Sequence, residues 1–252
     1  MLFRSVRVAV IDTARDAAHP ALANILVDEF NALPDVPVKD FDHATSIIGL
    51  IAGQDGFAGL APGAHIFHAR AFENGKSNAN AIIAAMDWAA EQDAQIINMS
   101  FESPTNNALL EKACAAAARL GIMLVAAAGN HGPEAPPAYP AAYKNVVGVT
   151  ATDAQNQRMA AANIGSYIRI SAPGVGVMAP VPGGGYDLVT GTSFAAAVYA
   201  GAIASLMHRA PEKTGSHWER LVAKTAIDLG EKGRDAQYGF GLVNIKAVLA
   251  AN

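Results

Sequence analysis

The chain has 252 residues, with 18 Lys or Arg against 22 Asp or Glu, so its formal net charge is −4. This length suits one large α/β domain or two small ones and is enough to bury a full core. Because no basic run exceeds a residue or two, we expect neither a nucleic acid nor an anionic membrane as partner. The one cysteine, Cys114, excludes an internal disulfide and a thiolate zinc cluster, and its alanine-rich surroundings predict a buried helix face.

The beginning of the chain runs directly into a strand pattern. It lacks a separate apolar segment followed by a small-residue cleavage site, so we expect no signal peptide. The longest nearly uncharged apolar stretch, 194–207, is shorter than the roughly 18 to 20 residues that span a bilayer. This stretch therefore predicts a buried helix, and we expect no membrane span.

Short apolar runs, most of them rich in β-branched residues, then alternate with helical patterns. This alternation predicts an α/β fold with a mostly parallel sheet, helices on both faces and right-handed crossovers. The expected strands are 6–12, 64–70, 94–100, 121–129 and 145–151, and the expected helices are 43–53, 78–92 and 106–120.

The last third of the chain has a different character. A glycine- and proline-rich segment, 172–187, leads into an apolar helix that begins near Ser193, and two more helical patterns follow. The chain shows no internal repeat, linker or low-complexity tail. We therefore expect residues 1–252 to form one domain.

Polar residues directly after predicted strands are the first site candidates, because ligands gather at the carboxyl ends of parallel strands. Asp12 ends the first strand, and Asn130 follows the strand 121–129. Asn98 and Ser100 lie at the end of another strand, where we expect them to satisfy backbone groups near a pocket.

Two further candidates, His43 and Ser193, each open a helical pattern, where the helix dipole and free N–H groups stabilise negative charge. A serine hydroxyl is a poor nucleophile unless a base lies within hydrogen-bond reach and a carboxylate orients that base. Histidine suits the base role because its unperturbed pKa is about 6.5. Asp12, His43 and Ser193 are therefore candidates for a catalytic triad.

Each candidate also has an ordinary structural interpretation. A strand-end Asp is usually a cap or loop residue, a lone His is usually a packing or surface residue, and a Ser before a helix is usually an N-cap. Catalysis is favoured over these structural roles only because Asp12, His43 and Ser193 occur together with Asn130. His65 and His68 alternate on a strand without a third ligand nearby in sequence, so we expect structural roles, no metal site and no cofactor.

Ten segments of the sequence carry a family resemblance, and they follow one another along nearly the whole chain: VAVIDT, DHATSIIGLIAG, AGLAPGA, INMSF, VAAAGNHG, YPAAYKNVVGVTATD, ANIGS, SAPGV, GTSFAAAVYAG and YGFGLVNI. In this order they resemble the signature blocks of the subtilisin-like serine proteases. The resemblance implies a three-layer subtilisin-like fold, a peptide or protein substrate and hydrolysis through an acyl-enzyme. It also implies a secreted or extracytoplasmic location, although nothing in the chain itself directs export.

The resemblance assigns a role to each catalytic candidate. Ser193 attacks the scissile carbonyl, His43 takes its proton and passes it to the leaving amine, and Asp12 holds the imidazole in orientation. The side-chain amide of Asn130 and the backbone N–H of Ser193 bind the oxyanion.

The resemblance also implies where a substrate lies. Segments 98–103 and 126–130 flank S1, the pocket for the substrate side chain that precedes the scissile bond. Residues 73–78 offer an edge strand to the substrate backbone. Many relatives carry a prosegment, and we expect none within residues 1–252. A prosegment or an inhibitor is another candidate occupant of the cleft. The expected substrate-binding residues are Ser100, Phe101, Glu102, Ala127, Ala128, Gly129 and Ala138.

Several residues depart from the family pattern. Ala14 and Ala44 each replace a usual Gly, and neither is itself a triad residue. Glu102 also stands where the family has Gly, so it either narrows the cleft or favours a basic substrate residue. Ala197 replaces a usual Pro, which predicts a straighter helix and a slightly shifted Ser193. Reduced hydrolysis, or more acyl transfer to amines, is the hypothesis that follows.

Two loops near the expected site are short. The loop 53–56 is too short for the segment that wraps a calcium ion in many relatives, so we expect no calcium there. The loop after Asn130 carries Pro133, Pro136 and Pro137, which stiffen one wall of S1.

Two other functions remain to be weighed against a protease. A catalytically silent module of the same fold would bind peptides or partners, since the altered residues around the cleft could close it. A nucleotide-binding domain is disfavoured because the chain has no phosphate loop.

Overall fold

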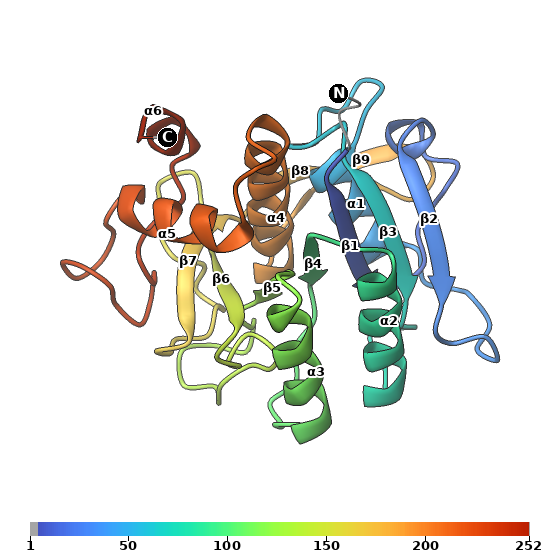
Figure 1. Cartoon of the computed structure of the whole chain (residues 1–252), viewed down its shortest axis with the longest axis horizontal. Coiled ribbons are helices and arrows are strands. Elements are labelled where there is room, and N and C mark those ends of the chain that lie inside the picture. Colours follow the sequence, from blue (N-terminus) through green and yellow to red (C-terminus); the bar gives the residue numbers. More distant parts are fainter. Residues whose placement is uncertain (1–4, 252) are drawn as a thin grey trace.

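A parallel sheet forms the middle layer of the molecule (Figure 1). The computed structural model describes residues 5–251; residues 1–4, part of the start in which we expect no signal peptide, and residue 252 lie outside the described residues. Among the described residues, seven strands pair in the order β2-β3-β1-β4-β5-β6-β7, and every pairing is parallel. The strands are β1 (Arg7–Asp12), β2 (Leu26–Asn31), β3 (His65–Arg70), β4 (Ile96–Met99), β5 (Met123–Ala127), β6 (Val146–Thr152) and β7 (Ile168–Pro173).

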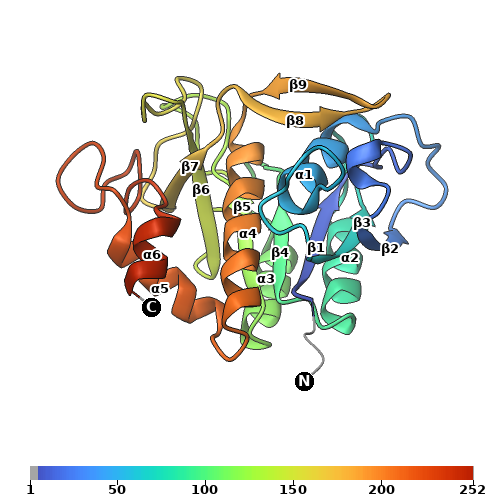
Figure 2. The same ribbon diagram turned by 90° about the horizontal axis from the view of Figure 1, so that it is seen from above.

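Helices cover both faces of this sheet (Figure 2). Successive side chains of a strand point to opposite faces, so Val8 and Val10 of β1 enter one apolar core while Ala9 and Ile11 enter another. The first core packs against α1, α4, α5 and α6, and the second against α2 and α3. This arrangement confirms the predicted three-layer α/β fold. The helices are α1 (Asp42–Ala52), α2 (Ala79–Glu91), α3 (Ala108–Arg119), α4 (Thr192–Arg209), α5 (Gly215–Thr225) and α6 (Ile245–Ala251), with a short 3₁₀ helix η1 (Pro20–Leu22).

Two strands of the sheet, β2 and β7, were not among the predicted ones. The strand β2 lies at the edge of the sheet with most of its residues exposed or half-buried, so its charged sequence lacks the continuous apolar pattern of a central strand. The glycine- and proline-rich segment 172–187 also contains structure: β8 (Val177–Val181) and β9 (Gly185–Val189) form an antiparallel hairpin. This hairpin packs on α1, where the hydroxyl of Ser46 donates to the carbonyl of Pro180 at 2.7 Å.

Two helices carry residues that the sequence singled out. Cys114 is buried in α3, as predicted, and burial raises the pKa of its thiol to about 12. The helix α4 continues without interruption through the fully buried Ala197. Within residues 5–251, every helix is too short or too polar to cross a bilayer.

Candidate active site

Four side chains with predicted catalytic roles meet at one edge of the sheet. Asp12 is the last residue of β1, and Asn130 lies three residues beyond β5. His43 and Ser193 are each the second residue of a helix, α1 and α4. All four line one cleft with a cavity volume of about 320 Å³.

The carboxylate of Asp12 holds the imidazole of His43. The Nδ1 atom of His43 lies 2.8 Å from Oδ1 and 2.9 Å from Oδ2 of Asp12, which is 3% exposed. The N–H of Thr13 also donates to Oδ1 at 2.7 Å. Because an ionised carboxylate only accepts hydrogen bonds, Nδ1 carries the proton and Nε2 is left as the acceptor in the neutral ring. The His43 side chain is 31% exposed, so this atom is open to the cleft.

The pKa of His43 is raised above its ordinary value. Burial disfavours the imidazolium, but the charge of Asp12, the hydrogen bond to Asp12 and the charge of Asp40 together outweigh it. The surroundings therefore stabilise the charged form that appears when His43 accepts a proton.

The hydroxyl of Ser193 does not contact His43 in this structure. It donates to the backbone carbonyl of Ser100 at 3.0 Å, and no hydrogen bond joins Ser193 to His43 among the described residues. The Ser100 hydroxyl in turn donates to the carbonyl of Ser193 at 2.9 Å and accepts from Asn98 at 2.8 Å. Asp12 and His43 are therefore linked as expected, whereas the Ser193 hydroxyl must rotate away from Ser100 to reach the base.

Two N–H donors face the cleft near Ser193 without a partner. The Oδ1 atom of Asn130 accepts from the N–H of Thr192 at 2.9 Å and from its hydroxyl at 3.0 Å. This fixes the carboxamide, and Nδ2 has no hydrogen-bond partner in the described part of the chain. The N–H of Ser193 lies in the first turn of α4, where no intrahelical acceptor exists. The pair can donate to a negatively charged oxygen.

Most of the expected substrate-binding residues line cavities beside these groups. The wall that contains Phe101 is tied to Tyr139, because Ser103 and Tyr139 exchange backbone hydrogen bonds of 2.8 and 2.9 Å. In the opposite wall, Tyr167 donates to the carbonyl of Ala128 at 2.7 Å. Ser100, Phe101, Glu102 and Ala127 line the main cleft, and Glu102 and Ala138 line an adjoining cavity of about 120 Å³, whereas Ala128 and Gly129 line neither cavity.

The segment 73–78 is not an edge strand, so this expectation is wrong. Glu73 and Lys76 pair with each other through two backbone hydrogen bonds of 3.0 Å, across a tight turn. Asn74 and Gly75 form the turn, with φ angles of 49° and 69°. The N–H and C=O groups at both ends of the turn are therefore already paired, and Gly75 is the residue of this segment that lines the cleft.

Sequence reasoning missed a buried ion pair that supports the site. Arg70 and Glu73 are almost fully buried and lie 2.7 Å apart, and the hydrogen bond from Arg70 is the largest cause of the lowered pKa of Glu73. Arg70 also donates to the carbonyls of Leu33 and Pro37, while the N–H of Lys39 donates to Glu73. These bonds hold the loop that leads into α1. In a sequence, two charged residues three positions apart at the end of a strand are expected to be exposed to solvent. The role of Arg70 and Glu73 becomes visible only when the loop that they hold is placed over them.

The two strand histidines have structural partners. Nε2 of the buried His68 lies 2.8 Å from the carbonyl of Thr13, which follows Asp12, and His65 lies 2.8 Å from Asp28. Within residues 5–251, no group of three or more His, Cys, Asp or Glu side chains is placed to hold a metal ion.

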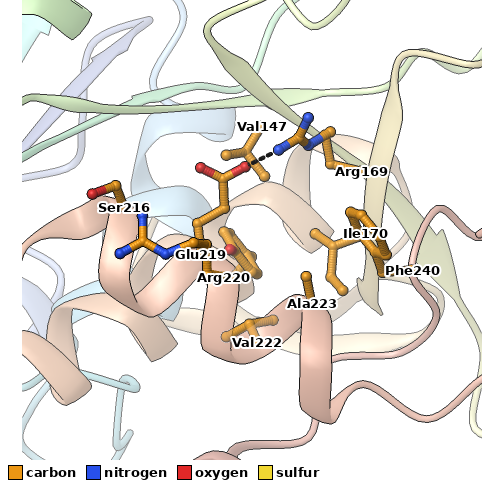
Figure 3. Close-up of a pocket in the computed structure, with 10 residues that line it drawn as sticks. Val147, Arg169, Ile170, Ser216, Glu219, Arg220, Val222, Ala223 and Phe240 are labelled. Atoms are coloured by element: carbon orange, nitrogen blue, oxygen red, sulfur yellow. Dashed lines mark hydrogen bonds and ion pairs between the residues drawn. The ribbon is translucent and has the colours of Figure 1, made fainter.

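A different cavity, of about 230 Å³, lies at the opposite edge of the sheet (Figure 3). Val147 and Arg169, near the starts of β6 and β7, line it together with residues of α5. Arg169 forms an ion pair with Glu219 and lies over the ring of Phe240, 6.0 Å from its centre. None of the predicted site residues lines this cavity.

Comparisons with known proteins identify the family of this chain. The chain matches the model of the subtilase family over residues 4–241. It is 33% identical to subtilisin NAT of Bacillus subtilis subsp. natto, covering 96% of this chain and 65% of that protein. It is 32% identical to the subtilisin of Bacillus pumilus, covering 96% of this chain and 90% of that protein. The chain thus spans just under two thirds of subtilisin NAT and most of the second relative.

Solved structures with the same fold include two further proteases. The prenylagaramide maturation protease PagA is 25% identical, with a TM-score of 0.86 over 98% of this chain and 93% of that chain. A lanthipeptide protease is 26% identical, with a TM-score of 0.85 over 98% of this chain and 88% of that chain. Since the family model matches nearly the whole sequence and the relatives cover 96% of it, the chain belongs to the subtilase family.

Proposed function

We propose that this chain is a serine endopeptidase, formed as one peptidase domain, that hydrolyses peptide bonds through an acyl-enzyme. The observation that carries the proposal is the Asp12–His43 pair, which faces into the same cleft as the Ser193 hydroxyl. The free donors on Asn130 and on the Ser193 backbone support it, because they can stabilise the charge that forms on a tetrahedral intermediate.

The first half of the reaction forms the acyl-enzyme. The Ser193 hydroxyl turns from Ser100 to Nε2 of His43 and attacks the scissile carbonyl carbon, and His43 takes its proton. Asp12 stabilises the imidazolium, while the carbonyl oxygen becomes an oxyanion held by Asn130 and the Ser193 N–H. His43 then gives the proton to the leaving amine as the peptide C–N bond breaks.

The second half repeats the sequence with water. His43 takes a proton from the water molecule, whose oxygen attacks the acyl carbon, and the same two donors hold the second oxyanion. The proton returns to the Ser193 oxygen as the ester bond breaks. The product acid leaves and the free enzyme is restored.

The substrates that fit this chemistry are peptides or proteins, and a prosegment or inhibitor would occupy the same cleft. An extracytoplasmic location is the part of the proposal that relies on relatives alone. The minor extracellular protease Epr of Bacillus subtilis (strain 168) is 34% identical over 82% of this chain, although the chain spans 33% of that protein.

A fluorophosphonate probe, which reacts with an activated serine, tests the proposal. We expect the wild-type chain to be labelled and Ser193→Ala to remain unlabelled. Ser216→Ala is the matched control, because Ser216 is also the second residue of a helix, α5, and its hydroxyl lies 3.0 Å from the hydroxyl of Thr214, outside the cleft that contains His43. Absence of labelling in the folded wild-type chain would contradict the proposal and favour a silent peptide-binding module of the same fold.

A further inference from the structure

The side chain of Glu102 lies between the two walls of the pocket beside Ser193. Its Oε1 atom accepts from the backbone N–H of Asn130 at 3.0 Å and lies 3.0 Å from Nδ1 of His131. Glu102 itself belongs to the opposite wall. It lines both the cleft that contains Ser193 and the adjoining cavity that contains Ala138. A substrate side chain that passes from the cleft into this cavity must pass the carboxylate.

The second oxygen of this carboxylate is unused. Oε2 faces Gly129, where an added Cβ atom would lie only 2.4 Å away, and it has no hydrogen-bond partner within residues 5–251. Gly129 has a φ of 109°, so this position is suited to glycine in conformation as well as in space. A side chain at position 129 would collide with this carboxylate and with the side chain of Asn163, so glycine is needed there for both to keep their places.

The charge of this carboxylate also lacks a permanent counterion. The Glu102 side chain is only 15% exposed, and its one ion-pair partner in the described part of the chain is His131, which is 70% exposed and charged only when protonated. A mostly buried carboxylate with a free lone pair and no Lys or Arg beside it is unfavourable unless a cation joins it. A ligand whose cationic group can donate a hydrogen bond would supply both the missing charge and the missing donor.

The apolar part of the cavity lining suits the stem of such a ligand. Next to the carboxylate and the polar lining residues His131 and Asn163, apolar surface is presented by Pro104, Ala135, Pro136 and Ala138. The methylene groups of Lys or Arg can pack there while the charged end donates to Oε2. An acidic side chain would be repelled by the Glu102 carboxylate. A large aromatic side chain would have to displace this carboxylate from the N–H of Asn130, and the carboxylate would then be buried without its hydrogen bond.

We propose that Glu102 makes this pocket select Lys or Arg at the substrate residue that precedes the scissile bond. The inference rests on the proposed peptidase function and names its substrate class. It decides between the two expectations drawn from the sequence: Glu102 favours a basic residue rather than merely narrowing the cleft.

A set of fluorogenic peptides that differ only at that residue, carrying Arg, Lys, Gln, Leu, Phe or Glu, tests this. We expect kcat/KM of the wild-type chain to be at least about tenfold higher for Arg and Lys than for the others. Glu102→Gln keeps an acceptor for the Asn130 N–H and removes the charge. It should lower kcat/KM for Arg and Lys by about 10- to 100-fold and leave Gln and Leu within about threefold.

The matched control is Glu134→Gln. Glu134 is an exposed carboxylate on the loop beside the pocket and lines neither cavity. The substitution changes the net charge by the same amount, so an unchanged Arg and Lys preference in this variant excludes a long-range charge effect. Glu102→Ala serves as a second variant should Glu102→Gln fail to fold.

Three outcomes would overturn the inference. A wild-type profile without a basic preference would do so whatever the variants show. A basic preference that survives in Glu102→Gln would place its cause elsewhere, and a loss that is equal for all six peptides would mean that Glu102 only positions Asn130. Fluorophosphonate labelling separates these results from failure of the peptidase proposal: an unlabelled wild-type chain overturns both, whereas a labelled chain without a basic preference overturns only this inference.

Discussion

One cleft lies at the carboxyl ends of the strands and one cavity lies at their amino ends. Both are lined by a mixture of polar and apolar residues, but their polar groups make different interactions. In the cavity of Figure 3, Arg169 and Glu219 bind each other. Burial raises the pKa of Tyr199, which also lines this cavity, above its ordinary value. In the cleft, neighbours fix one side of His43 and Asn130 and leave the other side free. Orientation combined with an unused donor or acceptor, rather than cavity size, distinguishes the candidate active site.

Removing the nucleophile is the strongest way to break this comparison. We expect Ser193→Ala to lower kcat/KM for peptide hydrolysis by about 10⁴- to 10⁶-fold, because the remaining donors can only stabilise an attack by water. Initial rates on a peptide substrate, with circular dichroism to verify folding, measure this. Retention of more than a few per cent of activity would mean that another residue attacks.

Removing the amide of Asn130 should have the next largest effect. We expect Asn130→Ala to lower kcat by about 10²- to 10³-fold with little change in KM, because its N–H stabilises charge that exists only in the transition state. Steady-state kinetics over a range of substrate concentrations separate the two constants. A rise in KM alone would show that Asn130 binds the ground state instead.

The pH dependence sharpens the role of the charges around His43. The neutral imidazole is the base, and its pKa is raised, so kcat/KM should increase with pH and reach its plateau above pH 6.5, with a slope of about tenfold per unit on the acid side. Asp40→Asn removes one cause of the raised pKa and should move this limb to lower pH. A limb that does not move would exclude a contribution from Asp40.

The substitution Ala197→Pro tests the helix behind the nucleophile. In a regular helix, the N–H of Ala197 is the donor to the carbonyl of Ser193, and a proline removes it. We expect the variant to shift the partitioning of the acyl-enzyme from aminolysis toward hydrolysis by about two- to fivefold. Product ratios in the presence of an added amine measure this, and equal partitioning in both chains would discard the hypothesis.

The smallest effect is expected at the other end of the sheet. Glu219→Gln breaks a partly exposed ion pair, so it should lower the free energy of unfolding by at most about 1 kcal/mol. We expect kcat/KM to remain unchanged. A large loss of activity in a stably folded variant would show that the cavity of Figure 3 is coupled to the cleft, and the distinction between the two regions would fail.

The central strands and the positions of the polar site residues could be predicted because both follow from local pattern. β1, β4, β5 and β6 consist mainly of apolar residues, and β3 combines apolar residues with His65 and His68. A polar residue such as Asp12 at the end of such a strand must lie at the sheet's carboxyl edge. The edge strand β2 and the hairpin β8–β9 were missed because exposed strands lack that pattern.

Contacts between distant segments explain what the sequence did not reveal about the site. The Ser193 hydroxyl bonds to the carbonyl of Ser100, 93 residues away in the chain, and no local signal contains that bond. Likewise, the carboxylate of Glu102 enters the pocket only because Gly129 and Asn130, on another strand end, leave space and supply a donor.

The reciprocal bonds between Ser100 and Ser193 have a consequence for timing. The Ser193 hydroxyl donates a hydrogen bond to the carbonyl of Ser100, which belongs to the wall along which a peptide would lie. An incoming backbone N–H that claims this carbonyl would deprive the hydroxyl of its acceptor and leave Nε2 of His43 as the next one in reach. Arrival of the substrate and readiness of the nucleophile would then be a single event.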